Sequence, residues 1–449
     1  MKPNKLPLGL FAATRAIAQG SLSPTDYLQQ CIARADEREP ALHAFVARTP
    51  AQEILASVDG GEWAGIPVGI KDLIATRTLT TTNGSPIYTD QVLDYDAPIV
   101  AHIRQLGAAV FGKTVTTEFA WRQPGPTVNP FHAGHTPGGS SSGSAAAVGA
   151  GIVPLALGTQ TVGSVIRPAA FCGVVGFKAS FGAVPRAGVF PLAGSLDHVG
   201  FIARSVNDVA YAFNLLRNRA ATEPDSIVLP AVPMKTDTGI EPQAAPRLAW
   251  LRTPYDERVT AEQQQAMERA VKQLRAQGAV IEEFALPDEY WTGIDAMFCL
   301  LECEGGAIHQ EHVKHFAERS SVHLKELVEK GRVRSALEYL GARALQQRLR
   351  ANAAVQLKGF DAILTIPATG EAPEGLAFTG DPVFCALWSF LGLPALTVPI
   401  ARSAKGLPLG LQLIGRAFGE ETLFACAQVL EDAAPKTAKP APWWEGARP

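Results

Sequence analysis

Two distant segments of the chain share one order: a helix with an apolar face, a glycine that ends it, and a short apolar strand. In the first, apolar side chains recur at helical spacing over residues 99–106, Gly107 follows, and residues 109–111 have the composition of a strand. Residues 266–281 repeat this order around Gly278. Helices that alternate with short apolar strands are typical of α/β proteins, in which helices cover a central sheet. We therefore expect an α/β fold.

The length of the chain allows one large α/β domain or two ordinary ones, and we expect a single domain with a substantial core. The chain has 449 residues, of which 47% are hydrophobic and 18% charged, as in soluble globular proteins. The segment 23–26 has the form of a helix start, with a serine cap followed by proline. The expected parts of the domain are a helical N-terminal segment (1–60) available for contacts in a homodimer, a surface excursion (219–246), a helical covering or lid region (306–357) and a surface tail (434–449).

Charge and cysteine content argue against several classes of protein. Forty basic and 43 acidic residues give a net charge of −3, so we expect the protein to bind neither nucleic acid nor a membrane surface. The six cysteines form no C-x-x-C pair, which favours reduced thiols in the cytoplasm. The most apolar stretch, 145–157, is too short to span a bilayer and contains Pro154. Pro7 and Gly9 interrupt the only stretch that resembles a signal peptide.

One lysine and two Ser/Gly motifs carry the chemistry. Lys71 ends the apolar segment 66–70, and the motifs occupy residues 138–144 and 158–168. Hydrolysis of an amide needs an activated nucleophile, stabilisation of the oxyanion and a proton for the leaving amine. A lysine serves as the base only when neutral, and burial can lower its pKa from about 10.4 to ~7–8. Strand alternation points Asp72 away from Lys71, so this carboxylate should not hold the lysine charged.

The two motifs supply the remaining groups. Ser140, in a glycine-rich turn before an alanine-rich helix, can relay protons because a hydroxyl both donates and accepts. Ser164 follows a strand and a loop, and it suits the nucleophile. The peptide N–H groups of Thr161, Val162, Gly163 and Ser164 could converge on an oxyanion hole.

These motifs resemble those of the amidase signature family. The resemblance runs from about Ser23 to Ala427 and also includes the segments 195–200, 392–399 and 406–415. It implies a single domain whose mixed, twisted central sheet is covered by helices on both faces. It implies that Lys71 is the base, Ser140 the bridging serine after a cis peptide bond, and Ser164 the nucleophile. It also implies that no metal or organic cofactor takes part.

Two positions depart from the general family pattern. Gln160 stands where aspartate is usual, although the segments 134–137, 158–161 and 164–169 are similar to the malonamidase-like branch. Val162 stands where glycine is usual in the oxyanion loop. Because a β-branched residue adds bulk beside the nucleophile, we predict that Val162 narrows the acyl side of the pocket.

Residues around this site have weaker signals. Arg167 could clamp a substrate carboxylate or serve as a buried structural arginine, and we favour the structural role. The aromatic side chains Trp121, Phe190 and Trp388 are candidates to line an apolar pocket, although most large aromatics belong to a core.

Three further groups of residues have mainly structural interpretations. Ser141 is expected to hold the turn through backbone hydrogen bonds, and Asp197 to tie loops together near the site. The histidines at 309, 312 and 315 are spaced for a helix face, but we expect solvated side chains and no metal site.

Three alternative functions compete with this interpretation. Residues 107–114 match the P-loop pattern, but a helix end and a strand occupy the positions where a phosphate loop is needed. Residues 139–143 match G-x-S-x-G, which would make Ser141 the nucleophile of an α/β-hydrolase, but a loop precedes them instead of a strand. A relative in the resembled family is the glutaminase subunit of a tRNA-dependent amidotransferase. We favour a free-standing hydrolase of small amides, with anilides, carbamates and carboxylated amides open as substrates.

Overall fold

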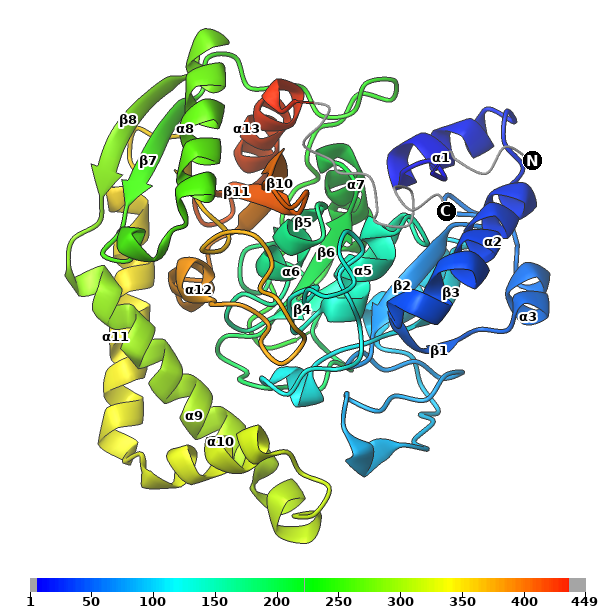
Figure 1. The fold of residues 1–449 in the computed structure, drawn as a ribbon, viewed down its shortest axis with the longest axis horizontal. Helices are drawn as coiled ribbons and strands as arrows, with labels where there is room; N and C mark the ends of the chain where they lie inside the picture. The colour runs from blue at the N-terminus through cyan, green and yellow to red at the C-terminus, as the bar shows by residue number, and fades with distance from the viewer. Residues whose placement is uncertain (1–5, 222, 436–449) are drawn as a thin grey trace.

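A twisted, mixed β-sheet forms the centre of the computed structural model, which describes residues 6–221 and 223–435 (Figure 1). Its strands are β1 (Phe45–Arg48), β2 (Pro67–Lys71), β3 (Ala109–Thr114), β4 (Leu155–Gln160), β5 (Val175–Lys178), β6 (His198–Ala203), β7 (Arg247–Arg252), β8 (Val280–Ala285), β9 (Ala362–Thr365), β10 (Ala395–Arg402) and β11 (Pro408–Ile414). Within the described residues they form one sheet of 11 strands in the order β1-β3-β2-β4-β6-β5-β10-β11-β9-β7-β8. Strand β2 is parallel to both neighbours, β3 and β4. The expected α/β fold is confirmed.

Helices cover both faces of this sheet (Figure 1). They are α1 (Leu10–Ala18), α2 (Pro24–Leu42), α3 (Ala51–Ala56), α4 (Pro98–Gln105), α5 (Ser142–Gly149), α6 (Ile166–Phe171), α7 (Val206–Leu216), α8 (Ala261–Ala276), α9 (Glu289–His315), α10 (Val322–Val333), α11 (Ala336–Gln356), α12 (Val383–Phe390) and α13 (Glu420–Ala433). Strand alternation divides the core between the two faces: Leu155 and Leu157 of β4 pack in one apolar cluster, and Ala156 packs in the other.

The predicted helix ends and strands occur where glycine and capping residues stand. Ser23 caps α2, since its hydroxyl accepts a hydrogen bond from the Asp26 N–H at 3.4 Å. Gly107 follows α4 with φ +85° and Gly278 follows α8 with φ +95°, a left-handed backbone that favours glycine. Strands β3 and β8 begin shortly after them.

Helices α9, α10 and α11 form an arm that extends away from the sheet at the lower left of Figure 1. Helix α9 packs against α10, α11 and α12. The helical region expected at 306–357 therefore begins earlier, at Glu289, and it is interrupted between α9 and α10 and again between α10 and α11.

Other segments differ in part from expectation. The N-terminal segment 1–60 is not helical throughout, because residues 45–48 pair with β3 at the edge of the sheet. The excursion 219–246 lacks helices and strands in its described part, yet Leu229, Val232 and Ile240 are buried. Of the expected tail, residues 436–449 lie outside the described residues.

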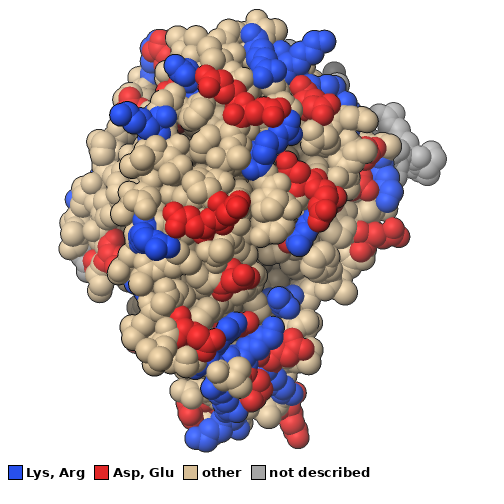
Figure 2. Space-filling view, turned by 90° about the vertical axis from the view of Figure 1, so that its left-hand side faces the viewer, with Lys and Arg blue, Asp and Glu red and all other residues tan. Residues whose placement is uncertain are grey.

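The distribution of charged side chains on the surface agrees with the near-neutral net charge. Basic and acidic side chains are interspersed on the face shown in Figure 2. No helix in the described ranges combines the length and the apolar character that a membrane span requires.

Candidate active site

Lys71 lies at the end of β2, a strand whose side chains are all buried. Its Nζ is 2.8 Å from Ser140 Oγ, 2.7 Å from Thr159 Oγ1 and 3.3 Å from the Thr159 carbonyl oxygen. All of these partners are uncharged. Burial lowers the pKa of Lys71 well below its usual value, and the negative charge of Asp197 opposes this effect. The amine is therefore suited to act as a base.

The residue after this lysine faces another partner, as strand alternation predicts. The Asp72 carboxylate accepts hydrogen bonds from the N–H and hydroxyl of Thr82 and lies 3.7 Å from the Lys113 Nζ. The buried Lys113 therefore pairs with Asp72, and among the described residues no ion pair holds Lys71 in its charged form.

Ser140 and Ser141 begin the segment that leads into α5. The Gly139–Ser140 peptide bond is cis, as the family resemblance implied. The hydroxyl of Ser141 donates to the Thr159 carbonyl at 3.2 Å and accepts from the Thr159 N–H at 3.2 Å. Ser141 therefore fastens this turn to β4, whereas the hydroxyl of Ser140 faces Lys71.

Ser164 lies in the loop after β4 and lines the same cavity as Ser140. In the described part of the chain, no hydrogen bond uses a peptide N–H of residues 161–164 as its donor. The next two N–H groups, of Val165 and Ile166, donate to Gln160 Oε1 at 2.9 and 3.0 Å. The loop thus presents free donors beside a serine, which is the arrangement that an oxyanion hole requires.

Gln160 also connects this loop to α12. Its Nε2 donates to Ser389 Oγ at 3.0 Å, and Ser389 Oγ donates to the Val162 carbonyl at 2.7 Å. Gly163 packs closely on α12, since a Cβ there would lie 2.9 Å from the Cβ of Cys385. The hydrogen bonds of Gln160 therefore fix the backbone of this loop against α12.

Asp197 ties three segments together, in agreement with its expected role. Its carboxylate accepts hydrogen bonds from Thr161 Oγ1 at 2.5 Å, from the Leu192 N–H at 2.8 Å and from the Ala193 N–H at 3.0 Å. Burial raises the pKa of Asp197 to about 6.

A cavity of about 560 Å³ opens in front of Ser140 and Ser164. Val162 and Trp121 lie on its wall, and the Trp121 Nε1 donates to the His323 carbonyl at 3.1 Å. The remaining wall comes mainly from the arm and from loops outside the catalytic motifs: Tyr255, Arg258, Ile294, Phe298, Phe378 and Asp381. Among these, Phe298 is an aromatic residue of the kind expected there. The mixed aromatic and charged wall suits a small organic substrate.

Two aromatic candidates lie elsewhere. Trp388 is only 2% exposed and packs in the core, because α12 is buried along its whole length. Trp388 lines neither of the two cavities at the site, so its predicted role in substrate binding has no support in the structure. Phe190 lines a second cavity of about 440 Å³, which adjoins the first.

Arg167 has the contacts expected of a structural arginine. Its Nε donates to the Thr379 carbonyl at 2.8 Å and its Nη2 donates to the Gly139 carbonyl at 2.9 Å. Its Nη1 is buried without a partner among the described residues, while the side chain lines the cavity of Ser164. Two of its nitrogens thus hold the backbone, and one donor remains unused.

Thr159 was missed as a site residue. Its hydroxyl is a direct neighbour of the Lys71 amine. The available signal was its position at the end of an apolar strand, two residues before Thr161, since alternate strand residues face the same side.

The structure also decides among the alternative motifs. Residues 109–114 of the P-loop pattern form β3 inside the sheet, so they cannot cradle a phosphate. A loop, and not a strand, directly precedes the G-x-S-x-G pattern.

The histidines of α9 differ in their surroundings. His309 is fully buried against Phe119 and Phe190, so the expectation of a solvated side chain is wrong for His309. The expectation holds for the exposed His315. Among the described residues, no cluster of three or more His, Cys, Asp or Glu could hold a metal ion.

Comparisons with known proteins agree with this geometry. The family model described as Amidase matches residues 26–424. The chain is 33% identical to one of the subunits of the glutamyl-tRNA(Gln) amidotransferase of Anaeromyxobacter dehalogenans, over 97% of this chain and 98% of the relative. The solved peptide amidase PAM in complex with the competitive inhibitor chymostatin superposes with a TM-score of 0.83 at 29% identity, over 94% of this chain and 97% of that chain. A structure described as a vestigial protein complex that reveals the origins of an s-triazine catabolic enzyme gives a TM-score of 0.85 at 25% identity, over 95% and 98%.

Proposed function

Since the chain belongs to the amidase family and is an amidase-type enzyme, we propose that it hydrolyses small amides, with anilides and carbamates within its range. The single observation that carries the proposal is the environment of Lys71. A buried amine with only uncharged partners, 2.8 Å from a serine hydroxyl, is poised to accept a proton.

The proposed reaction begins with Ser164. Its Oγ attacks the acyl carbon while its proton passes to Ser140, and the proton of Ser140 passes to the neutral Lys71. The N–H groups of residues 161–164 stabilise the oxyanion. As the carbon–nitrogen bond breaks, Lys71 returns the proton through Ser140 to the leaving nitrogen. Water then hydrolyses the acyl-enzyme with the help of the same relay.

A substrate panel tests this function. Purified protein is assayed with a primary amide, an anilide and an aryl carbamate that share one acyl substituent, and the protein is labelled with a fluorophosphonate. We expect hydrolysis of at least one panel member and a label on Ser164 that is absent from Ser164→Ala. A label on another residue, or no turnover of any member, would contradict the proposal.

The amidotransferase relatives favour a second candidate. The relative from Anaeromyxobacter dehalogenans belongs to a glutamyl-tRNA(Gln) amidotransferase, and it matches almost the whole chain. This chain would then release ammonia from glutamine only together with partner proteins. Glutaminase activity that appears only when amidotransferase partners are added would support the second candidate over the first.

A further inference from the structure

The second cavity lies beside the proton relay. Three residues, Ala120, Thr161 and Leu192, line both this cavity and the one that contains Ser164. Thr159 lines the second cavity as well, and its Oγ1 is 2.7 Å from the Lys71 Nζ. The second cavity therefore adjoins the nucleophile's cavity, and Thr159 lies between it and the base.

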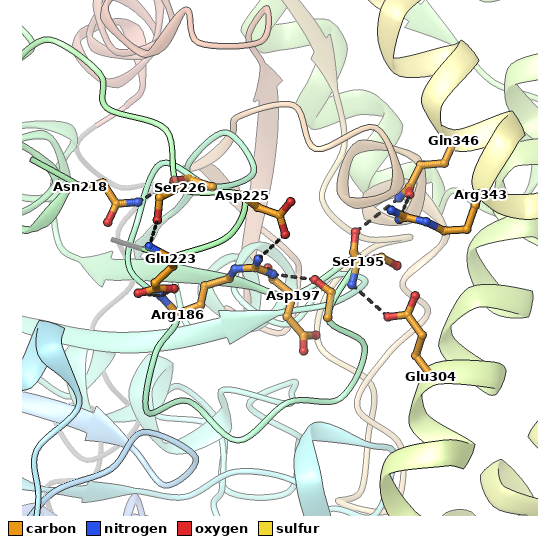
Figure 3. A network of polar contacts seen from close by, with 12 residues as sticks. Arg186, Ser195, Asp197, Asn218, Glu223, Asp225, Ser226, Glu304, Arg343 and Gln346 are labelled. Atoms are coloured by element: carbon orange, nitrogen blue, oxygen red, sulfur yellow. Dashed lines mark hydrogen bonds and ion pairs between the residues drawn. The ribbon is translucent and has the colours of Figure 1, made fainter. Parts of the chain in front are cut away.

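Arg186 contacts two other charged residues of this cavity, Glu223 and Asp225 (Figure 3). The Arg186 guanidinium lies 3.1 Å from the Asp225 carboxylate and donates to the Gly194 carbonyl at 2.6 Å. The Arg186 N–H donates to the Glu223 carboxylate at 3.0 Å. These charged groups are thus occupied within the protein, and they offer little to a charged ligand.

The rest of the wall is mainly apolar and reaches the surface. Its apolar members are Ala187, Val189, Phe190, Pro191, Leu192, Val199 and Pro224. Pro191 and Pro224 are exposed, so the cavity communicates with solvent. A volume of about 440 Å³ with such a wall accommodates an apolar group of the size of one ring.

The geometry of the proposed reaction indicates which part of the substrate the second cavity could hold. The acyl carbon must lie next to Ser164 with its oxygen toward the N–H groups of residues 161–164. The leaving nitrogen must lie near the Lys71–Ser140 relay that protonates it. We infer that the second cavity holds the substituent on the leaving nitrogen, and that the substrates are N-substituted amides with an apolar alkyl or aryl amine half.

Because this assignment rests on the proposed hydrolysis, its test compares two substrate series. One series keeps the acyl group and varies the amine from ammonia to methylamine, butylamine and benzylamine. The other series keeps a primary amide and varies the acyl group. The variants are Ala187→Phe, which fills the second cavity, Phe190→Ala, which enlarges it, and Ala276→Phe, a matched control at an exposed position of α8.

The expected result is a change that depends on the amine. Ala187→Phe should lower kcat/KM for the benzylamide about tenfold more than for the primary amide, and Phe190→Ala should shift the optimum toward larger amines. Ala276→Phe should leave both series unchanged. A loss that follows acyl size, or equal losses across the amine series, would overturn the inference. Failure of the unaltered enzyme to hydrolyse any member of either series would instead overturn the proposed function.

Discussion

The hydroxyl of Thr161 donates a hydrogen bond of 2.5 Å to the carboxylate of Asp197. This contact joins the loop that carries Ser164 to the segment around Leu192, and it forms part of the partition between the two cavities. The same carboxylate affects the base, because its negative charge raises the pKa of Lys71 against the effect of burial. One side chain thus influences both the shape and the proton affinity of the site.

Replacement of Asp197 by Asn should move the acidic limb of the pH–rate profile to lower pH. The asparagine keeps an acceptor for Thr161 but removes the charge that favours the ammonium form of Lys71. The pKa of Asp197 is about 6, so the shift applies above that pH, where the native carboxylate is charged. Profiles of kcat/KM for both proteins measure it, and a limb displaced to higher pH contradicts it.

The native enzyme should become faster as the pH rises and should stay active in mildly alkaline solution. Burial lowers the pKa of Lys71, and only the neutral amine accepts a proton from Ser140. Activity is therefore lost as the pH falls through this lowered pKa. Initial rates between about pH 5 and 10 test this. Lys71→Met, which cannot accept a proton, should be inactive across the range; a bell-shaped profile centred in the acid range would exclude lysine as the base.

Substitution at Ser164 and Ser141 should separate the two proposed nucleophiles. Ser164→Ala should lower kcat by at least about 10³-fold, since it removes the attacking oxygen. Ser141→Ala removes two hydrogen bonds to the backbone of Thr159, so it should cost about 1 kcal/mol of stability and retain turnover. Thermal denaturation and steady-state kinetics distinguish the two effects. Retained turnover in Ser164→Ala would refute the assignment.

Val162→Gly should widen the acyl range of the enzyme. Val162 lines the cavity beside Ser164 and is 8% exposed. Loss of its side chain should raise kcat/KM for branched acyl groups relative to acetyl by roughly tenfold. A series of primary amides measures the ratio, with Val228→Gly as a control on the exposed excursion. An unchanged acyl preference would show that Val162 does not limit this side.

Local motifs indicated which residues lie together around Lys71, because each motif lies within a short stretch of backbone. Lys71 ends a strand and Ser140 precedes a helix. The pairing of β2 with β4, to which Ser141 fastens the turn, brings the two segments together. The wall of the cavity could not be predicted in this way, because it depends on packing between distant elements. Trp388 and Phe190 have similar local signals, yet one packs in the core and the other lines a cavity.

In the proposed mechanism, the groups that move protons and the residues that line the rest of the cavity belong to different elements. The relay belongs to the sheet and the adjoining turns, whereas Ile294, Phe298 and His323 enter the cavity wall from the arm. Mutations in the arm can therefore alter which molecules are accepted while the proton-transfer geometry is preserved. This separation lets new specificities arise without rebuilding the catalytic apparatus.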